Sequence, residues 1–330
     1  MSVPGVFCAG ALLLALVPLW LPLGAMIDLA RGRWRLPIVR LLLFALGWAL
    51  LESVAMLAVA ALWLVGRSGD RRLHYALQRW WAARLMASLR STTGIRVEAT
   101  GLDSFAPSPV IMLCRHASLA DSLVSAWVVT TLAGLHPRYV LKRELLFDPC
   151  LDIVGNRLPN HFLDRGATDS GPELAALTAL TTDLDLGDVA IIFPEGTRAS
   201  PAKRAKALQR LTERDPMRAQ RLAGLRHLLP PRPAGALALL AGHPTADVVI
   251  AWHTGFDGLD TFGGILRHLA SRPPPVRFVA RRVARSMVPT GDDFIKWLDE
   301  AWLQADLAVE LLLGGEHLVS GTDSTDERPA

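Results

Sequence analysis

Two long apolar stretches dominate the N-terminal part of the chain. Residues 3–27 carry no charged side chain, and residues 41–65 carry only Glu52. At about 1.5 Å of rise per residue, either stretch is long enough as a helix to enter or cross a bilayer. Pro18 and Pro22 predict a bend in the first stretch. We therefore expect residues 1–70 to form an N-terminal pair of membrane helices, with Glu52 protonated, paired or at the water boundary.

The charges beside these stretches leave their topology open. Arginines lie in the link between them, residues 31–35, and again just after the second stretch, at residues 67–72. Positive charge on both sides fits a spanning hairpin and a re-entrant hairpin equally. A cleaved signal peptide is disfavoured, because the N-terminus lacks a positive region and a second apolar stretch follows. We expect an integral or monotopic membrane protein whose active site faces the cytoplasm.

Residues 71–92 have a different, amphipathic pattern. Apolar side chains recur every four residues while arginines occupy the other faces, and the apolar stripe is Leu73, Leu77, Trp81, Leu85 and Leu89. Such a basic helix suits a membrane surface, and the pair Trp80-Trp81 favours that interfacial position. Packing of the stripe on the following domain is the alternative.

Beyond Gly94, short apolar runs alternate with helical patterns. Strands are predicted at residues 95–100, 109–114, 138–141, 188–193, 246–252 and 275–281. Helices are predicted at residues 119–134, 172–184, 202–223, 234–242, 258–270 and 291–313. This alternation predicts an α/β domain over residues 93–318, with a mostly parallel central sheet flanked by helices. The polar tail, residues 319–330, has the composition of a disordered segment.

Composition narrows the class of protein. Hydrophobic residues make up 51% of the chain and the mean hydropathy is +0.29, which fits membrane association. Three widely separated cysteines predict a reducing compartment and neither a disulfide framework nor a zinc site. The chain contains no Gly-x-Ser-x-Gly elbow, no Gly-x4-Gly-Lys loop and no histidines paired at ligand spacing. We expect no cofactor, no metal and no nucleic-acid partner.

The first candidate site lies in the turn after the strand at 109–114. His116 occupies this turn and Asp121 falls in the first turn of the next predicted helix, for which Ser118 is a candidate N-cap. Because His116 lies outside the helix, its ring can fold back toward Asp121. A carboxylate there fixes the imidazole tautomer and stabilises the imidazolium, as a general base acting on a hydroxyl requires. A hydrogen-bonded structural histidine is the alternative for this stretch alone.

Charged side chains also follow other predicted strands and apolar runs. Residues 193–198, Phe-Pro-Glu-Gly-Thr-Arg, bring Glu195 and Arg198 to the edge of the sheet, with Gly196 permitting close backbone approach. Lys142 follows the strand at 138–141, and Arg165 follows the apolar run at 161–163. A loop fixed by prolines, residues 228–235, offers one further arginine at position 232. For any single loop, an exposed salt-bridged turn is the alternative.

Taken together, these motifs resemble the glycerophospholipid acyltransferase family, typified by lysophosphatidic acid acyltransferases. The His116-to-Asp121 turn, the region from Lys142 to Arg165, residues 193–198 and the proline loop follow the order and approximate spacing of the family's four sequence blocks, over about residues 95–255. The hexapeptide at 193–198 matches the third block at every position. Arg115 departs from the asparagine that is common before the histidine. Residues 225–235 also resemble the branch that contains lysocardiolipin and lysophosphatidylinositol acyltransferases, although Pro231 is inserted there.

The resemblance implies a reaction and a role for each residue. His116, oriented by Asp121, would take the proton from a glycerol hydroxyl of a lysophospholipid, which then attacks the thioester of acyl-CoA or of an acyl carrier protein. Arginine side chains, with Lys142 as a weaker candidate, would bind the phosphate of the acceptor. Glu195 would hold Arg198 or a glycerol hydroxyl. The residues implied to contact substrate are Lys142, Arg165, Glu195, Gly196, Thr197 and Arg198.

The identity of the acceptor stays open at this point. Lysophosphatidic acid, which would give phosphatidic acid, is the preferred acceptor. A remodelling enzyme that takes lysophosphatidylinositol or lysocardiolipin is one alternative. A non-catalytic membrane protein that binds anionic lipid is another, since the same charges would serve it, but lipid binding alone does not require both His116 and Asp121. The expected partners are the two substrates and membrane lipids, and the sequence leaves the oligomeric state open.

Overall fold

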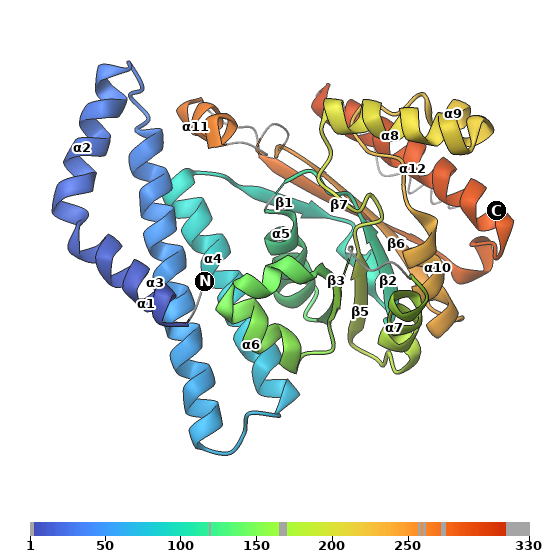
Figure 1. Cartoon of the computed structure of the whole chain (residues 1–330), viewed down its shortest axis with the longest axis horizontal. Coiled ribbons are helices and arrows are strands. Elements are labelled where there is room, and N and C mark those ends of the chain that lie inside the picture. Colours follow the sequence, from blue (N-terminus) through green and yellow to red (C-terminus); the bar gives the residue numbers. More distant parts are fainter. Residues whose placement is uncertain are drawn as a thin grey trace, which may run out of the picture.

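The N-terminal part of this computed structural model is helical, and the remainder is one α/β unit (Figure 1). The structure describes residues 3–118, 120–164, 170–256, 259, 262–271 and 275–314. Arg165 and the predicted tail at 319–330 lie outside these residues. The N-terminal helices are α1 (Val3–Ala15), α2 (Val17–Ala30) and α3 (Pro37–Leu64).

The first apolar stretch is bent, as its prolines predict. The chain bends by 69° between α1 and α2. Pro18 lies in the first turn of α2, where its missing N–H breaks no helical hydrogen bond. Pro22 lies inside α2. Within the described residues, α3 is the one helix long and apolar enough to cross a membrane alone, and α1 with α2 passes the same test only as a bent pair. At 28 residues, α3 is about 42 Å long.

The amphipathic stripe at residues 71–92 faces the protein. It lies on α4 (Arg71–Thr93), which packs against α3 and against the α/β unit. Leu85 and Leu89 are buried, and Trp81 Nε1 donates a hydrogen bond of 3.0 Å to Glu52 Oε1 of α3. The apolar stripe therefore packs on the following domain. It does not occupy the interfacial position that we favoured from the sequence. Glu52 is paired, one of the three environments expected for it.

A mostly parallel sheet forms the centre of the α/β unit, as predicted. The order of the seven described strands is β1-β7-β6-β2-β5-β3-β4, and every neighbouring pair is parallel except β6 with β7. The strands are β1 (Val97–Thr100), β2 (Val110–Cys114), β3 (His136–Lys142), β4 (His161–Leu163), β5 (Asp188–Ile192), β6 (Asp247–Thr254) and β7 (Val276–Val283). Because β6, β2, β5, β3 and β4 are parallel, the loops after them gather at one edge of the sheet.

Helices cover both faces of this sheet (Figure 1). They are α5 (Asp121–Trp127), α6 (Pro149–Arg157), α7 (Gly171–Thr182), α8 (Pro201–Arg214), α9 (Pro216–Leu222), α10 (Pro233–Gly242), α11 (Phe262–Ala270) and α12 (Asp292–Leu313). A π-helical segment (Val128–Leu132) extends α5, and short 3-10 helices span Leu102–Phe105, Arg143–Phe147 and Arg285–Met287.

Alternate side chains of β2 enter two separate hydrophobic cores. Ile111 and Leu113 pack with residues of α7, α10 and α12. Val110, Met112 and Cys114 pack with residues of α4 and α5 on the other face. All five side chains are fully buried. A continuous apolar run in the sequence therefore marks a central strand that is covered on both faces.

Local hydrogen bonding moves the ends of two predicted helices. The helix predicted at 119–134 begins at Asp121, because Ser118 donates its N–H and its hydroxyl to that carboxylate and does not act as the N-cap. The helix predicted at 202–223 is divided into α8 and α9. The division falls at Pro216, where the Asp215 carboxylate accepts a hydrogen bond of 3.0 Å from the N–H of Arg218.

Two elements, α6 and β4, were not predicted. Helix α6 starts with a recognisable signal, because the Asp148 carboxylate accepts from the N–H of Cys150 at 2.9 Å and Pro149 occupies the first turn. Strand β4 has three half-buried residues paired with β3. Its short apolar run at the edge of the sheet carries too little periodicity to predict a strand.

Candidate active site

The turn after β2 joins His116 to Asp121 as predicted. His116 Nδ1 lies 2.8 Å from Asp121 Oδ2, and the same oxygen accepts from the N–H groups of Ala117 at 2.6 Å and Ser118 at 2.8 Å. Asp121 Oδ1 accepts from the Ser118 hydroxyl at 2.5 Å. Because an ionised carboxylate can only accept, Nδ1 carries the proton of the neutral ring. The Nε2 atom of His116 is then the nitrogen with a lone pair, as a general base needs.

Burial and charge suit this pair to proton transfer. The Asp121 side chain is fully buried, whereas 16% of the His116 side chain is exposed. Burial opposes ionisation of Asp121, but His253 and His116 outweigh it and hold the pKa of the carboxyl well below its usual range. The ring of Phe193 packs against the imidazole, with centroids 4.8 Å apart. An anion therefore lies beside an imidazole that substrate can reach.

Glu195 has a different role from the one expected. Its side chain is buried, and Oε1 accepts from the N–H of His116 at 2.7 Å while Oε2 accepts from the N–H of Leu229 at 2.9 Å. Burial raises the pKa of Glu195 to about 8, although both backbone N–H groups favour the charged form. The carboxyl is directed at the backbone of two loops and not at Arg198, so the expectation that Glu195 holds Arg198 is wrong.

The rest of the hexapeptide loop lies against the proline loop. Gly196 has a φ of +69°, and a Cβ atom there would lie 3.2 Å from Nε of Arg232. The N–H of Arg232 donates to the carbonyl of Pro194 at 2.8 Å. Thr197 and Arg198 follow, both half-buried. The structure thus adds Arg232 to the cations near this loop.

The end of the hexapeptide loop contacts the turn that holds His116 directly. The N–H of Ala199 donates a hydrogen bond of 2.7 Å to the carbonyl of His116. Arg198 therefore directly precedes a backbone contact with His116. Lys142 ends β3, which β5 separates from β2, so it reaches the same edge of the sheet two strands away. Arg165 lies outside the described residues.

Two buried polar residues beside the pair were not predicted as site residues. His253 of β6 is 1% exposed, and its Nε2 lies 3.2 Å from Asp121 Oδ1. Arg115, also 1% exposed, donates from its guanidinium to the carbonyl of His253, 138 residues away in sequence. Both contacts depend on β6 lying next to β2, and no local pattern in the sequence signals that pairing.

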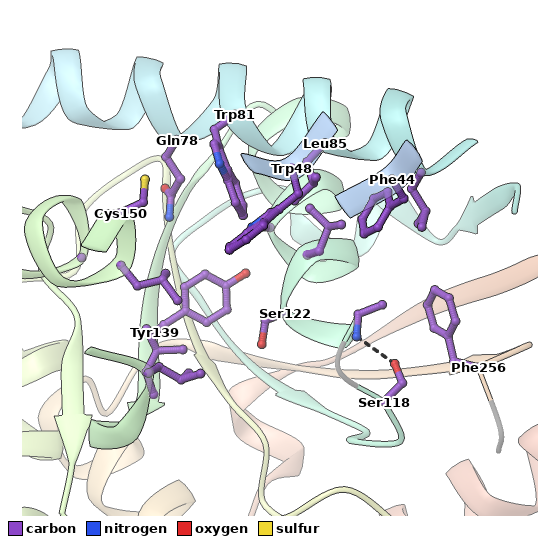
Figure 2. A pocket seen from close by; sticks show the side chains of 18 of the residues that line it. Phe44, Trp48, Gln78, Trp81, Leu85, Ser118, Ser122, Tyr139, Cys150 and Phe256 are labelled. Carbon is purple, nitrogen blue, oxygen red and sulfur yellow. Dashed lines mark hydrogen bonds between the residues drawn. The ribbon is translucent and has the colours of Figure 1, made fainter. Parts of the chain in front are cut away.

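An apolar cavity of about 430 Å³ begins beside the pair (Figure 2). Ser118 and Phe256 lie at one end of it, and Gln78 and Cys150 lie at the other. Its walls come mainly from apolar residues of α3, α4, α5 and α6, with Trp81 directed inward from α4. Since Ser118 donates to Asp121, one end of the cavity adjoins the carboxylate that contacts His116.

Within the described residues, no group of three or more histidine, cysteine, aspartate or glutamate side chains could hold a metal ion. A histidine oriented by a buried aspartate can take a proton from a hydroxyl and return it to a leaving group.

Comparison with known proteins agrees with this geometry. Residues 96–250, which include His116, Asp121 and the hexapeptide loop, match the family model described as Acyltransferase. Residues 96–250 therefore form an acyltransferase domain. The match supports the resemblance to glycerophospholipid acyltransferases that the sequence motifs indicated. The acyltransferase domain thus contains the turn, the hexapeptide loop and the proline loop that meet at the edge of the sheet.

One solved structure is similar to this chain over most of its length. It is the crystal structure of the 1-acyl-sn-glycerophosphate (LPA) acyltransferase PlsC from Thermotoga maritima, at 16% sequence identity and a TM-score of 0.47. The alignment covers 80% of this chain and 95% of that chain. No curated protein matches the chain.

Proposed function

We propose that this acyltransferase moves an acyl group from acyl-CoA or an acyl carrier protein to the free glycerol hydroxyl of a lysophospholipid, with lysophosphatidic acid as the preferred acceptor. The observation that carries the proposal is the hydrogen bond between His116 Nδ1 and Asp121 Oδ2 at the end of an apolar cavity. A general base and a space for an acyl chain are the two features that this reaction needs side by side.

In the proposed mechanism, His116 Nε2 takes the proton of the acceptor hydroxyl as that oxygen attacks the carbonyl carbon of the thioester. The tetrahedral intermediate then collapses and the carbon–sulfur bond breaks. The departing thiolate takes the proton back from the imidazolium, so the products are an ester and a free thiol. Asp121 stays ionised throughout and stabilises the imidazolium. No covalent enzyme intermediate is required.

The cavity suits the acyl chain of a substrate. Its volume of about 430 Å³ lies within the range of small-molecule sites. Each methylene group that leaves water contributes about 0.8 kcal/mol to binding. The hydroxyl groups of Ser118 and Ser122 line part of it, and Ser118 lies at the end next to Asp121, which suits the thioester or ester carbonyl (Figure 2).

The charged edge of the sheet suits the phosphate of the acceptor. Arg198 is proposed as the principal ligand, and Arg232, which packs over Gly196, lies close enough to that loop to assist it. Lys142, at the end of β3, is a candidate for the outer part of the headgroup, and so is Arg165, which lies outside the described residues. Gly196 and Thr197 complete the loop that faces this headgroup. Bidentate arginine contacts suit phosphate oxygens.

The N-terminal helices are proposed to hold the active site at a membrane, where lysophospholipid is presented. Large apolar side chains are exposed on all three of them, among them Leu12, Leu19, Met26, Leu57 and Trp63. Large exposed apolar side chains in such number favour a membrane or partner interface. The active site is proposed to face the cytoplasm, where acyl thioesters are available.

The decisive experiment follows thiol release from acyl-CoA by membranes that contain the protein, with a panel of lysophospholipids as acceptors. We expect His116→Ala to lower the rate by a factor of about 100 to 1,000, as for loss of a general base. His243→Ala, which changes a histidine away from the turn, is the matched control. Full activity of His116→Ala would exclude the mechanism and favour a protein that only binds anionic lipid.

The same panel separates the two enzymatic alternatives. Preference for lysophosphatidic acid supports the biosynthetic assignment. Preference for lysophosphatidylinositol or lysocardiolipin would replace it with the remodelling assignment and leave the mechanism intact.

A further inference from the structure

We infer that His253 is a positioning residue for the catalytic base, which it reaches through Asp121. The inference rests on the proposed function. In this arrangement His116 contacts one oxygen of the Asp121 carboxylate and His253 faces the other. The carboxylate therefore lies between two imidazoles, one directed at substrate and one enclosed in the protein.

The environment of His253 leaves Asp121 as its natural partner. The ring is 1% exposed, and neither ring nitrogen forms an aligned hydrogen bond with a described residue. A buried polar group without a partner costs about 1–3 kcal/mol. Asp121 Oδ1 lies 3.2 Å from Nε2, so a small rotation of the ring or the carboxylate completes a hydrogen bond. Catalytic hydrogen bonds are often poorly aligned before substrate binds and tighten in the complex.

The fold fixes His253 at this place from two directions. The guanidinium of Arg115 donates to the carbonyl of His253, and the N–H of Arg115 donates to the carbonyl of Ala251 at 2.9 Å. The ring of Phe256, which lines the cavity, meets the ring of His253 edge-on with centroids 5.8 Å apart. His253 thus lies between the carboxylate and the wall of the proposed acyl site.

The charged groups around His253 determine whether replacing its ring makes His116 more basic or less basic. Asp121 faces the ring from α5, His116 lies on the far oxygen of that carboxylate, and Arg115 approaches from the end of β2. Glu195, from the loop after β5, is close enough to influence Asp121. A hydrogen-bond donor at Oδ1 stabilises the negative charge of Asp121. That charge then attracts a proton on His116 less strongly. Without that donor, Asp121 attracts a proton on His116 more strongly.

The test compares His253→Phe, which keeps a ring but removes the donor, with His253→Gln, which keeps a neutral donor. Thiol release is measured against pH in the assay described above. For His253→Phe we expect kcat to fall about tenfold, and we expect the acid limb of kcat/KM to move up by about 0.5–1 pH unit, because His116 becomes more basic. For His253→Gln we expect the limb to stay in place and most of kcat to return. His243→Phe is the control.

Two results would overturn the inference. One is a folded His253→Phe variant whose acid limb does not move, which would make the role of the ring purely structural. The other comes from nitrogen-15 NMR of the labelled wild-type imidazoles, which needs no variant: a neutral His253 with its proton on Nδ1 could not donate to Asp121. An inactive wild-type protein would instead contradict the proposed function, and the NMR result would still decide the tautomer.

Discussion

Glu195 illustrates how one buried side chain can join two loops of a candidate site. It accepts one backbone hydrogen bond from the turn of the base and one from the proline loop. In Glu195→Gln, the amide keeps one acceptor oxygen and turns a donor toward the other N–H group. We expect the free energy of unfolding to fall by about 1–3 kcal/mol, measured by chemical denaturation in detergent. A variant as stable as the wild type would show that the two contacts are dispensable.

The same carboxyl predicts how stability depends on pH. Burial raises the pKa of Glu195 from 4.5 in the unfolded chain to about 8 in the folded protein, so the folded protein binds this proton more tightly. The resulting stabilisation is fully present below about pH 4.5 and is lost as the pH rises through about 8. We expect the advantage of wild type over Glu195→Gln in thermal unfolding midpoint to shrink over that range. An advantage that grows with pH would contradict the raised pKa.

Arg198 is the residue on which recognition of the acceptor is predicted to depend. It is half-buried and directly precedes the backbone contact between Ala199 and His116. We expect Arg198→Ala to raise KM for a phosphorylated acceptor by a factor of about 10 to 100, because a charge-assisted contact is lost, and to leave KM for the acyl donor unchanged. Arg210→Ala, an exposed arginine on α8, is the control. An unchanged KM for the acceptor would remove Arg198 from the site.

At the scale of the element, α4 matters as a wall of the cavity. Gln78 and Trp81 are directed from it toward the cavity, and Gln78 lies at the end remote from Ser118 (Figure 2). We expect Gln78→Phe to shorten the space available to an acyl chain. The ratio of kcat/KM for decanoyl-CoA to that for palmitoyl-CoA should then rise about tenfold or more, since a few methylene groups at about 0.8 kcal/mol each lose their site.

The chain-length prediction has a matched control on another helix. Gln209→Phe introduces the same side chain at an exposed position of α8. It should leave the preference for acyl length unchanged. If Gln78→Phe also leaves that preference unchanged while the protein stays folded, the acyl chain does not occupy this cavity.

At the scale of the whole molecule, the exposed apolar residues of the N-terminal helices are predicted to set its attachment to membranes. Leu19 of α2 and Leu57 of α3 are 66% and 60% exposed. A lysine in the apolar part of a bilayer costs about 2.5–3.5 kcal/mol on insertion scales. We expect the double variant Leu19→Lys with Leu57→Lys to increase the fraction of protein that carbonate extracts from membranes.

Leu307 provides the control for this prediction, because it is also 60% exposed but lies on α12, on the opposite side of the molecule from α1 and α3 (Figure 1). We expect Leu307→Lys to leave the extractable fraction unchanged. Equal extraction of the double variant and the wild type would mean that these helices do not contact lipid through the exposed side chains.

The sequence by itself determined the features that depend on neighbours along the chain. The apolar run of β2 predicted a central strand, because a strand covered on both faces needs apolar residues at every position. The bond between His116 and Asp121 was predictable because the two residues are five apart in one turn. The alternation of strands and helices predicted the mostly parallel sheet, since parallel strands need helical connections.

Only the tertiary structure decided the features that depend on neighbours in space. The stripe of α4 fits a membrane surface and a protein interior equally well as a pattern, and the packing of α4 on α3 and α5 settled it. Glu195 accepts from the N–H of His116, and His253 faces Asp121, because β5 and β6 lie on either side of β2. The order of strands in a sheet results from the packing of the whole chain. No local pattern of hydrophobic and polar residues specifies it.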